Sequence, residues 1–304
     1  GQVPDRAAAA EPLADALAAG CDDPLVRWAA ARFSDASASD ADFRSDQQLF
    51  AALPAMTASP HPPFLKYAAT RSVQRALDAD DPEQPKLRMQ AEVLFVEAAS
   101  WPGYVADERR AVFAYLWRDL QDWPEVTWRR VCAALDERVA AVPGADAWLA
   151  HMLFGMRQSR EAWDRFMAAR LRRQLQDEPD YVEFLAQVRS AADRLEAAHA
   201  LAPNRPEAAS ELIRLEKALA KNEFRDSPQR IASRCRRWFE VAIAAQFDHL
   251  DAWHQMHLAL IPLWGGSYEQ QWALAHEALD IGRFDTDVSV RFRMTVDSLS
   301  SRKD

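Results

Sequence analysis

The sequence predicts an all-α protein built from stacked antiparallel helical hairpins, an α-solenoid. Three observations predict this fold class. The chain has only eight glycines in 304 residues and is rich in Ala, Leu, Arg, Glu and Asp, a composition that favours helices over strands. Prolines divide it into segments of helical length, none of which shows sustained alternation of apolar and polar residues. Similar segments also recur in its C-terminal half at the spacing of helical hairpins.

The first sixty residues are rich in Ala, Asp and Ser and are expected to form an N-terminal helical segment, 1–60. Short helices are expected around 12–19 and 24–33. A Ser/Asp/Ala tract at 34–42 then separates them from a further helical run that ends near Leu53. Helix-breaking prolines follow at Pro54, Pro60, Pro62 and Pro63.

Helices separated by proline-containing boundaries fill the rest of the chain. Proline lacks an amide hydrogen and disfavours helix at the residue before it, so it marks where a helix ends or starts. The expected helices are 64–80, 86–99, 106–121, 125–141, 145–158, 160–176, 180–201, 206–221, 228–246, 248–260, 267–281 and 286–298. We assign 61–144 to helical hairpins and 145–304 to a helical-repeat domain, and we interpret the whole chain as one continuous solenoid.

The C-terminal segment contains internal repeats. The stretch Glu196–Ala208 matches Glu240–Ala252 at an offset of 44 residues, and a third copy, Glu277–Asp285, begins 37 residues after the second. Each copy has the same order of helix end, short turn and helix start. The pattern resembles the tetratricopeptide repeat, a family of stacked antiparallel helix pairs. The resemblance implies a concave surface that binds protein.

A second resemblance covers residues 145–290. The segments that carry it are, in order, Ala147–Gly155, Ala162–Trp163, Ala197–Pro203, Arg237–Ala242 and Pro262–Ser267. This order is similar to a bacterial domain family of unknown function, which carries a Pro-Arg-Trp-Gly-Gly-Ser signature after a tetratricopeptide-like hairpin. Leu263 occupies the place of that family's usual arginine. The resemblance implies a helical-hairpin fold and transfers no catalytic residue.

The stretch PLWGGSYEQ, residues 262–270, is interpreted as a corner between two helices and not as a phosphate-binding loop. It follows a helix instead of a strand, and it lacks the lysine of a phosphate loop. We expect one of its glycines to adopt the left-handed conformation, and we expect Ser267 and Gln270 to form a capping box. Trp264 is expected to pack across the corner onto Trp272.

Charge and hydropathy exclude several classes of function. The net charge of −9 argues against a general nucleic-acid binder. No window approaches eighteen uninterrupted apolar residues, so no membrane span is expected. The sequence shows no secretory leader, and the expected location is a bacterial cytoplasm or periplasm, with no choice made between them.

The three cysteines predict no metal or cofactor site. Cys21, Cys132 and Cys235 lie far apart without a Cys-x-x-Cys pair, so neither a zinc site nor a dense disulfide framework is expected. A reactive thiol at Cys235 is the minor alternative, because the neighbouring arginines would favour its thiolate form.

One histidine cluster provides the enzyme alternative. Asp251, His254 and His257 follow one another at spacings of three on one helix, where neighbouring side chains could share a metal. A metal-dependent hydrolase that uses these three residues is therefore the alternative hypothesis. Packing and hydrogen bonding between helices is the favoured interpretation, since spacings of three turn around the helix and no His-Glu-x-x-His motif is present.

Arginine is concentrated in two stretches of this acidic chain: Arg157, Arg160, Arg165, Arg170, Arg172 and Arg173, then Arg225, Arg230, Arg234, Arg236 and Arg237. Solvated helix faces that form ion pairs with acidic neighbours are the favoured interpretation. The alternative is a basic groove for an acidic peptide or protein.

We therefore expect a non-enzymatic, helical-repeat scaffold that binds another protein or peptide. The net charge of −9 suits a basic or neutral partner surface, and the arginine stretches leave an acidic partner as the alternative. Neutralisation of a bacterial toxin and assembly of a larger complex are hypotheses for its role, and homo-oligomerisation is a further one. No cofactor is expected. The candidate partner-binding residues are Arg234, Arg237, Trp238, His254, His257 and Trp264.

Overall fold

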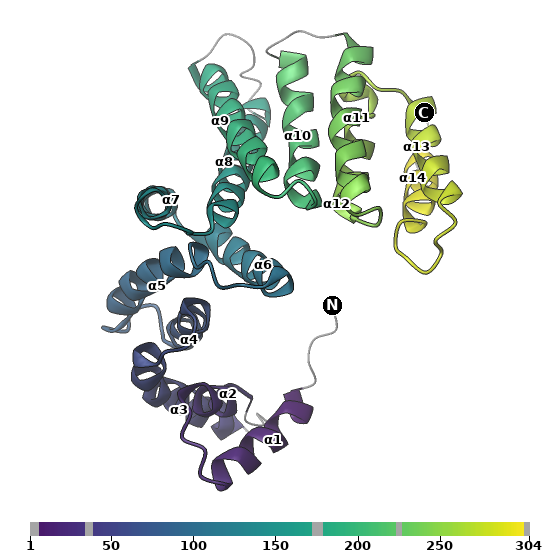
Figure 1. The fold of residues 1–304 in the computed structure, drawn as a ribbon. Coiled ribbons are helices and arrows are strands. Elements are labelled where there is room, and N and C mark those ends of the chain that lie inside the picture. The colour runs from purple at the N-terminus through teal and green to yellow at the C-terminus, as the bar shows by residue number, and fades with distance from the viewer. Residues whose placement is uncertain (1–5, 34–38, 172–178, 223–226, 301–304) are drawn as a thin grey trace. The chain divides into compact units, whose positions relative to one another are not determined.

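The structure is a computed structural model that describes residues 6–33, 39–171, 179–222 and 227–300. Within these ranges its regular elements are α-helices and one short 3-10 helix, without a strand, which confirms the all-α prediction (Figure 1). The elements are α1 (Arg6–Ala18), α2 (Pro24–Phe33), α3 (Ser39–Ala58), α4 (Pro63–Ala76), α5 (Gln84–Ala99), α6 (Ala106–Asp122), α7 (Glu125–Ala141), α8 (Ala147–Leu171), α9 (Pro179–Leu201), α10 (Pro206–Asn222), α11 (Pro228–Ala245), α12 (Leu250–Ala259), η1 (Pro262–Trp264), α13 (Tyr268–Asp280) and α14 (Val290–Ser300).

Several expected helix boundaries are wrong. A helix was expected around 12–19, whereas α1 begins at Arg6 and contains Pro12. We expected a break at Ser159, whereas α8 continues without interruption. Neither proline nor glycine occurs at 156–162 to break the helix. Ser159 is buried against α10, and this packing stabilises the helix across the expected break. Pro54 was expected to end its helix but lies inside α3. Its neighbours Leu53 and Met56 are buried in the core, and this packing outweighs the amide hydrogen bond that proline removes.

The tract expected at 34–42 lies partly outside the described residues. Its last four residues, 39–42, belong to α3.

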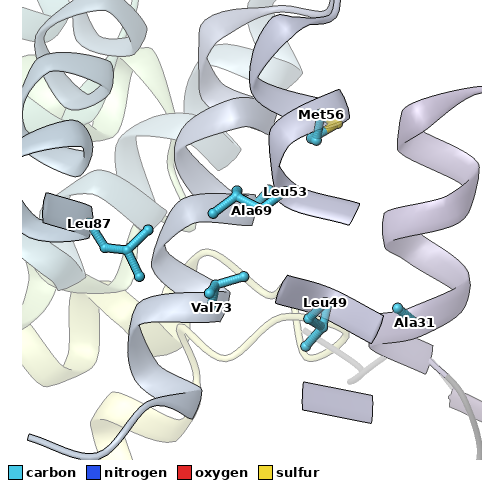
Figure 2. Close-up of a cluster of buried hydrophobic side chains, with 7 residues drawn as sticks. All are labelled: Ala31, Leu49, Leu53, Met56, Ala69, Val73 and Leu87. Carbon is cyan, nitrogen blue, oxygen red and sulfur yellow. The ribbon is translucent and has the colours of Figure 1, made fainter. Parts of the chain in front are cut away.

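The chain divides into two compact units, Gly1–Asp146 and Ala147–Asp304. In the first unit, each helix from α1 to α5 packs on the next one in sequence, and α5 also contacts α6 and α7. A cluster of buried apolar side chains from α2, α3, α4 and α5 forms part of its core, as Figure 2 shows. Its members are Ala31, Leu49, Leu53, Met56, Ala69, Val73 and Leu87.

A buried carboxylate joins α4 to α6 in the first unit. The side chain of Asp119 on α6 is fully buried. It accepts hydrogen bonds from the Tyr67 hydroxyl at 2.7 Å and from Arg71 Nε at 2.9 Å, and it forms an ion pair with Arg75. Burial and the nearby carboxylate raise the pKa of Tyr67 well above its usual value, so this phenol stays protonated and continues to donate. Asp119 therefore connects three donors of one helix to another helix.

The second unit is also built from helices that pack on their neighbours in sequence. α8 packs on α9, α9 on α10, and α10 on both α11 and α12, while α13 pairs with α14. Figure 1 shows α9, α10 and α11 as adjacent rods. Gly155 permits the close contact of α8 with α9, because a Cβ atom there would lie 2.7 Å from Leu195 Cγ. This unit carries all six candidate partner-binding residues.

We predict that Asp119→Asn lowers the unfolding free energy of the first unit by about 3–5 kcal/mol, because it leaves the buried Arg71 side chain without its compensating charge. The matched control is Asp122→Asn, which alters an exposed carboxylate at the end of the same helix and should change stability by less than about 0.5 kcal/mol. Chemical denaturation followed by circular dichroism measures both. Equal effects of the two substitutions would contradict the assigned role of Asp119.

Candidate functional site

The corner between α12 and α13 has the local structure that the sequence predicts. Residues Pro262–Trp264 form η1, and Gly265 follows in the left-handed conformation with φ of 92°. Ser267 Oγ accepts a hydrogen bond from the Gln270 amide, and Gln270 Oε1 accepts one from the Ser267 amide. The left-handed glycine and the capping box are both confirmed.

Gly266 meets a different requirement at this corner. A Cβ atom at this position would lie 2.0 Å from the carbonyl oxygen of Leu260, so no larger side chain fits without displacing the backbone. The Gly266 amide also donates to the Ile261 carbonyl oxygen at 3.3 Å. The two adjacent glycines are thus needed for different reasons. Gly265 is needed for its positive φ angle, and Gly266 for its close approach to the end of α12.

Trp264 does not pack onto Trp272, contrary to expectation. It is buried, and its ring meets Trp163 of α8 edge to face at 5.5 Å between centroids. The η1 turn directs the indole toward α8, whereas Trp272 contacts His276 and Phe292 near the C-terminal end. The structure therefore places Trp264 in the interior as a packing residue and not on a groove.

Lys217 of α10 is the charged residue that these rings enclose. Its Nζ lies 5.2 Å from the centroid of Trp163 and 5.4 Å from that of Trp264, and the residue is only 4% exposed. Burial and, to a smaller extent, the positive charge of Arg214 together lower the pKa of this ammonium to about 8. A lysine with a lowered pKa can act as a nucleophile, but this one is covered and cannot meet a substrate.

A buried polar network lies beside Lys217. Ser159 Oγ donates to Glu211 Oε1 at 2.7 Å and accepts from Arg214 at 2.6 Å, while Arg214 and Glu211 also form an ion pair. This network joins α8 to α10 and satisfies the Ser159 hydroxyl that the continuous α8 buries. We interpret it as a structural network, because its three side chains pair with one another inside the unit.

Cys235 is not a reactive thiol in this structure. It is fully buried and donates to the Ile213 carbonyl oxygen at 3.6 Å. Burial raises its pKa to about 12 and outweighs the neighbouring arginine that would favour the thiolate.

A groove of about 510 Å³ is formed by α11, α12 and α13. Its apolar part contains the buried side chains of Met256, Leu260 and Leu274. The polar side chains along it are Gln229, Ser233, Arg236, Arg237, Glu240, Gln270 and Glu277. An apolar floor with a charged rim is the usual composition of a site that binds a peptide side chain or a small molecule.

Most of the described arginines in the two concentrations form ion pairs with acidic neighbours. Arg236 donates to Glu240 at 3.1 Å and to Glu277 at 3.0 Å. Arg234 donates to Glu216 of α10 at 2.7 Å, which holds it against the neighbouring helix. These arginines agree with the favoured interpretation of ion-paired helix faces. The side chains of Arg170, Arg172, Arg173 and Arg225 lie outside the described residues.

Arg237 differs from these neighbours. It is exposed at the groove, and its guanidinium carbon lies 5.2 Å from the ring centroid of Trp238. No carboxylate among the described residues pairs with it. Trp238 itself is buried and also meets His199 edge to face, so it positions Arg237 but is not an exposed anchor.

His254 and His257 lie together in a second cavity, which is formed by α12, α13 and α14 and has a volume of about 220 Å³. His257 Nδ1 is 3.4 Å from Thr295 Oγ1, and its Nε2 is 3.3 Å from Gln271 Nε2. His254 Nδ1 is 3.5 Å from a terminal nitrogen of Arg291. Burial lowers the pKa of His254, and the positive charge of Arg291 lowers it further.

Asp251 does not join the two histidines as a metal ligand. It is exposed, and nowhere in the described part of the chain does a group of three or more His, Cys, Asp or Glu side chains have the arrangement needed to hold a metal. The metal-dependent hydrolase hypothesis therefore gains no ligand set from this structure.

The structure separates the six predicted partner-binding residues into three environments. Arg237 lines the groove, His254 and His257 line the second cavity, and Arg234, Trp238 and Trp264 are used in ion pairing and packing. Sequence reasoning missed Arg291, which comes from the last helix and carries no local motif. The apolar floor of the groove was also missed, since buried methionine and leucine side chains look like ordinary core residues in a sequence.

Comparison of the chain with protein-family models, with curated proteins and with solved structures found no significant match.

Among the described helices, none is both long and apolar enough to cross a membrane.

We predict that Gly266→Ala destabilises the second unit by at least about 3 kcal/mol, because the added methyl group overlaps the Leu260 carbonyl oxygen. Gly282→Ala is the matched control. Gly282 also has a positive φ, of 68°, but a Cβ atom there meets only open space, so the cost should be about 1 kcal/mol. Thermal unfolding of both variants compares them. A smaller loss for Gly266→Ala than for Gly282→Ala would rule out the close approach as the constraint.

We further predict that Lys217→Met stabilises the protein most at neutral pH. The folded-state pKa of Lys217 is about 8, below the unfolded value near 10.5, so below pH 8 the folded wild type carries the full cost of a buried ammonium. This cost disappears as the pH rises from 8 to 10.5. The stability advantage of the variant over wild type should therefore shrink by up to about 3 kcal/mol across this window.

Denaturation of both proteins in parallel at pH 7, 8, 9 and 10 measures this difference. The comparison cancels the titration of other groups, such as Tyr67, that both proteins share. An advantage that does not change with pH would mean that the two indole rings offset the burial of the ammonium completely.

Proposed function

We propose that the protein is a non-catalytic helical-repeat scaffold that binds an acidic segment of another protein in the groove between α11, α12 and α13. A tetratricopeptide-like stack of hairpins is part of the proposal. It is supported by the recurrence of similar segments at an offset of 44 residues and by the packing of α10 on both α11 and α12. Hairpin stacking alone is an analogy at the level of the fold, so the functional argument rests on the groove.

The observation that carries the proposal is the position of Arg237. Its guanidinium lies at the edge of the groove, is steadied over Trp238, and has no carboxylate partner among the described residues. Neighbouring Arg236 is already paired with two glutamates of the same groove. An acidic side chain of a ligand could form a bidentate ion pair with Arg237. The neighbouring arginines already form ion pairs with glutamates of the chain.

The floor of the groove specifies the rest of the ligand. Met256 of α12, Leu260 directly after that helix and Leu274 of α13 form the apolar floor, and methionine adapts its shape to different side chains. Glu240 and Glu277 also line the groove, and together they exceed the charge of Arg236, with which both pair, so a uniformly acidic ligand would be repelled there. The chemistry favours a segment with one or two acidic residues next to an apolar one.

Toxin neutralisation and complex assembly are two settings in which such a groove would act. Both require a reversible contact with a segment of another protein, and the groove does not favour one over the other. No contact among the described residues supports the metal-dependent hydrolase alternative more specifically.

We predict that Arg237→Glu weakens binding of a selected peptide at least about tenfold, because it replaces an attractive charge contact with a repulsive one. Peptides are first selected from a displayed library of random 12-residue sequences, with the full chain as the target. Selected sequences should be enriched in Asp or Glu beside a large apolar residue. Isothermal titration calorimetry then gives their dissociation constants for wild type and variant.

Arg293→Glu is the matched control, since it makes the same charge change on an exposed arginine of α14, outside the groove lining. It should leave the dissociation constant within about twofold. The proposal fails if no peptide is enriched, or if both substitutions weaken binding equally.

A further inference from the structure

The cavity between α12, α13 and α14 has the chemistry of a binding site that is separate from the groove. One part of its lining is polar and includes His254, His257, Arg291 and Thr295. The rest of its lining is apolar and includes Trp253 and Leu258. The volume of about 220 Å³ is below that of typical drug-sized pockets, so it suits a ligand of a few heavy atoms.

We propose that this cavity binds a small carboxylate whose short apolar chain contacts Trp253 and Leu258 while its oxygens meet Arg291 and His254. The proposal does not depend on the function proposed for the groove, because the two sites use different charged residues. Arg291 enters from α14 and His254 from α12, and they lie 3.5 Å apart, so a carboxylate that contacts both from the cavity would add to an existing contact between two helices.

The positive charge inside the cavity favours an anion. Arg291 is half-buried, and burial lowers its pKa more than the carboxylates of Asp251 and Asp287 raise it. Lys217 adds a further positive charge that acts on His254. A carboxylate attracts a partly buried cation more strongly than an exposed cation, because the local dielectric constant is lower.

The hydrogen-bonding groups of the cavity complete the recognition of a carboxylate. Arg291 also donates to the Leu250 carbonyl oxygen at 3.3 Å, which anchors the guanidinium to the start of α12. Thr295 can donate through its hydroxyl, and a neutral His254 can donate through the nitrogen that does not face Arg291. These polar groups lie within one cavity together with an apolar wall. A bare inorganic anion has no apolar part to place against that wall, so the wall favours a carboxylate with a short chain.

Titration calorimetry with sodium butyrate as the probe and butyramide as its neutral analogue tests the proposal. Butyrate should bind with a dissociation constant of about 1 mM, and the amide should bind at least about tenfold more weakly. A second pair of probes is an N-acetylated tripeptide ending in leucine, with a free or an amidated C-terminus. Stronger binding of the free-acid tripeptide than of butyrate would identify a chain terminus as the source of the carboxylate, and the reverse order would identify a small molecule.

Arg291→Gln should weaken binding of the better carboxylate at least about tenfold, and Arg291→Lys should restore part of it. The matched control is Arg293→Gln, which removes an exposed charge two residues along the same helix and should leave binding unchanged. If Arg291→Gln fails to fold, as judged by circular dichroism, His254→Gln tests the same cavity.

The proposal is overturned if neither carboxylate binds below about 10 mM, if the amides bind as well as the acids, or if folded Arg291→Gln or His254→Gln binds like wild type. Loss of groove binding in Arg237→Glu does not bear on these outcomes. Failure of one proposal can thus be told apart from failure of the other.

Discussion

The close approach of Gly266 to the Leu260 carbonyl oxygen is the constraint on which both proposed sites of the second unit depend. It sets where α13 starts relative to the end of α12, and both the groove and the smaller cavity take residues from these two helices. The same corner buries Trp264 against Trp163. A hairpin held at both its backbone turn and its aromatic contact has little freedom to change the width of either site. The sites are therefore largely formed before any ligand binds.

Buried charge is handled differently in the two units. Asp119 receives hydrogen bonds from Tyr67 and Arg71 and an ion pair from Arg75, so its desolvation is offset by directed contacts. Lys217 meets the faces of two indole rings, which attract its charge without accepting a conventional hydrogen bond. The first arrangement fixes the register of two helices. The second keeps a cation in the interior at a cost in stability, and this cation contributes to the positive potential around His254.

Local signals predicted much of the fold. The Ser267–Gln270 capping box and the left-handed Gly265 could be read directly, because a cap and a turn depend on residues next to one another in the chain. The continuity of α8 and the place of Pro54 inside α3 could not be read this way, since packing against distant helices decides them. The candidate sites show the same division. His254 and His257 form a visible cluster, but Arg291 reaches them from a helix that begins 36 residues after His254, which no spacing rule connects.

The negative net charge of the chain does not conflict with anionic ligands. Net charge governs solubility and long-range attraction, whereas a binding site responds to the charges within about a Debye length that the protein itself has not neutralised. Arg234 and Arg236 are neutralised by glutamates, so they add little to the local potential. Arg237 lies at an exposed groove without such a partner among the described residues, and Arg291 lies half-buried in the smaller cavity, close to His254. The attraction for an anion at the two proposed sites is thus a matter of local charge, and this selectivity is what a uniformly basic surface would lack.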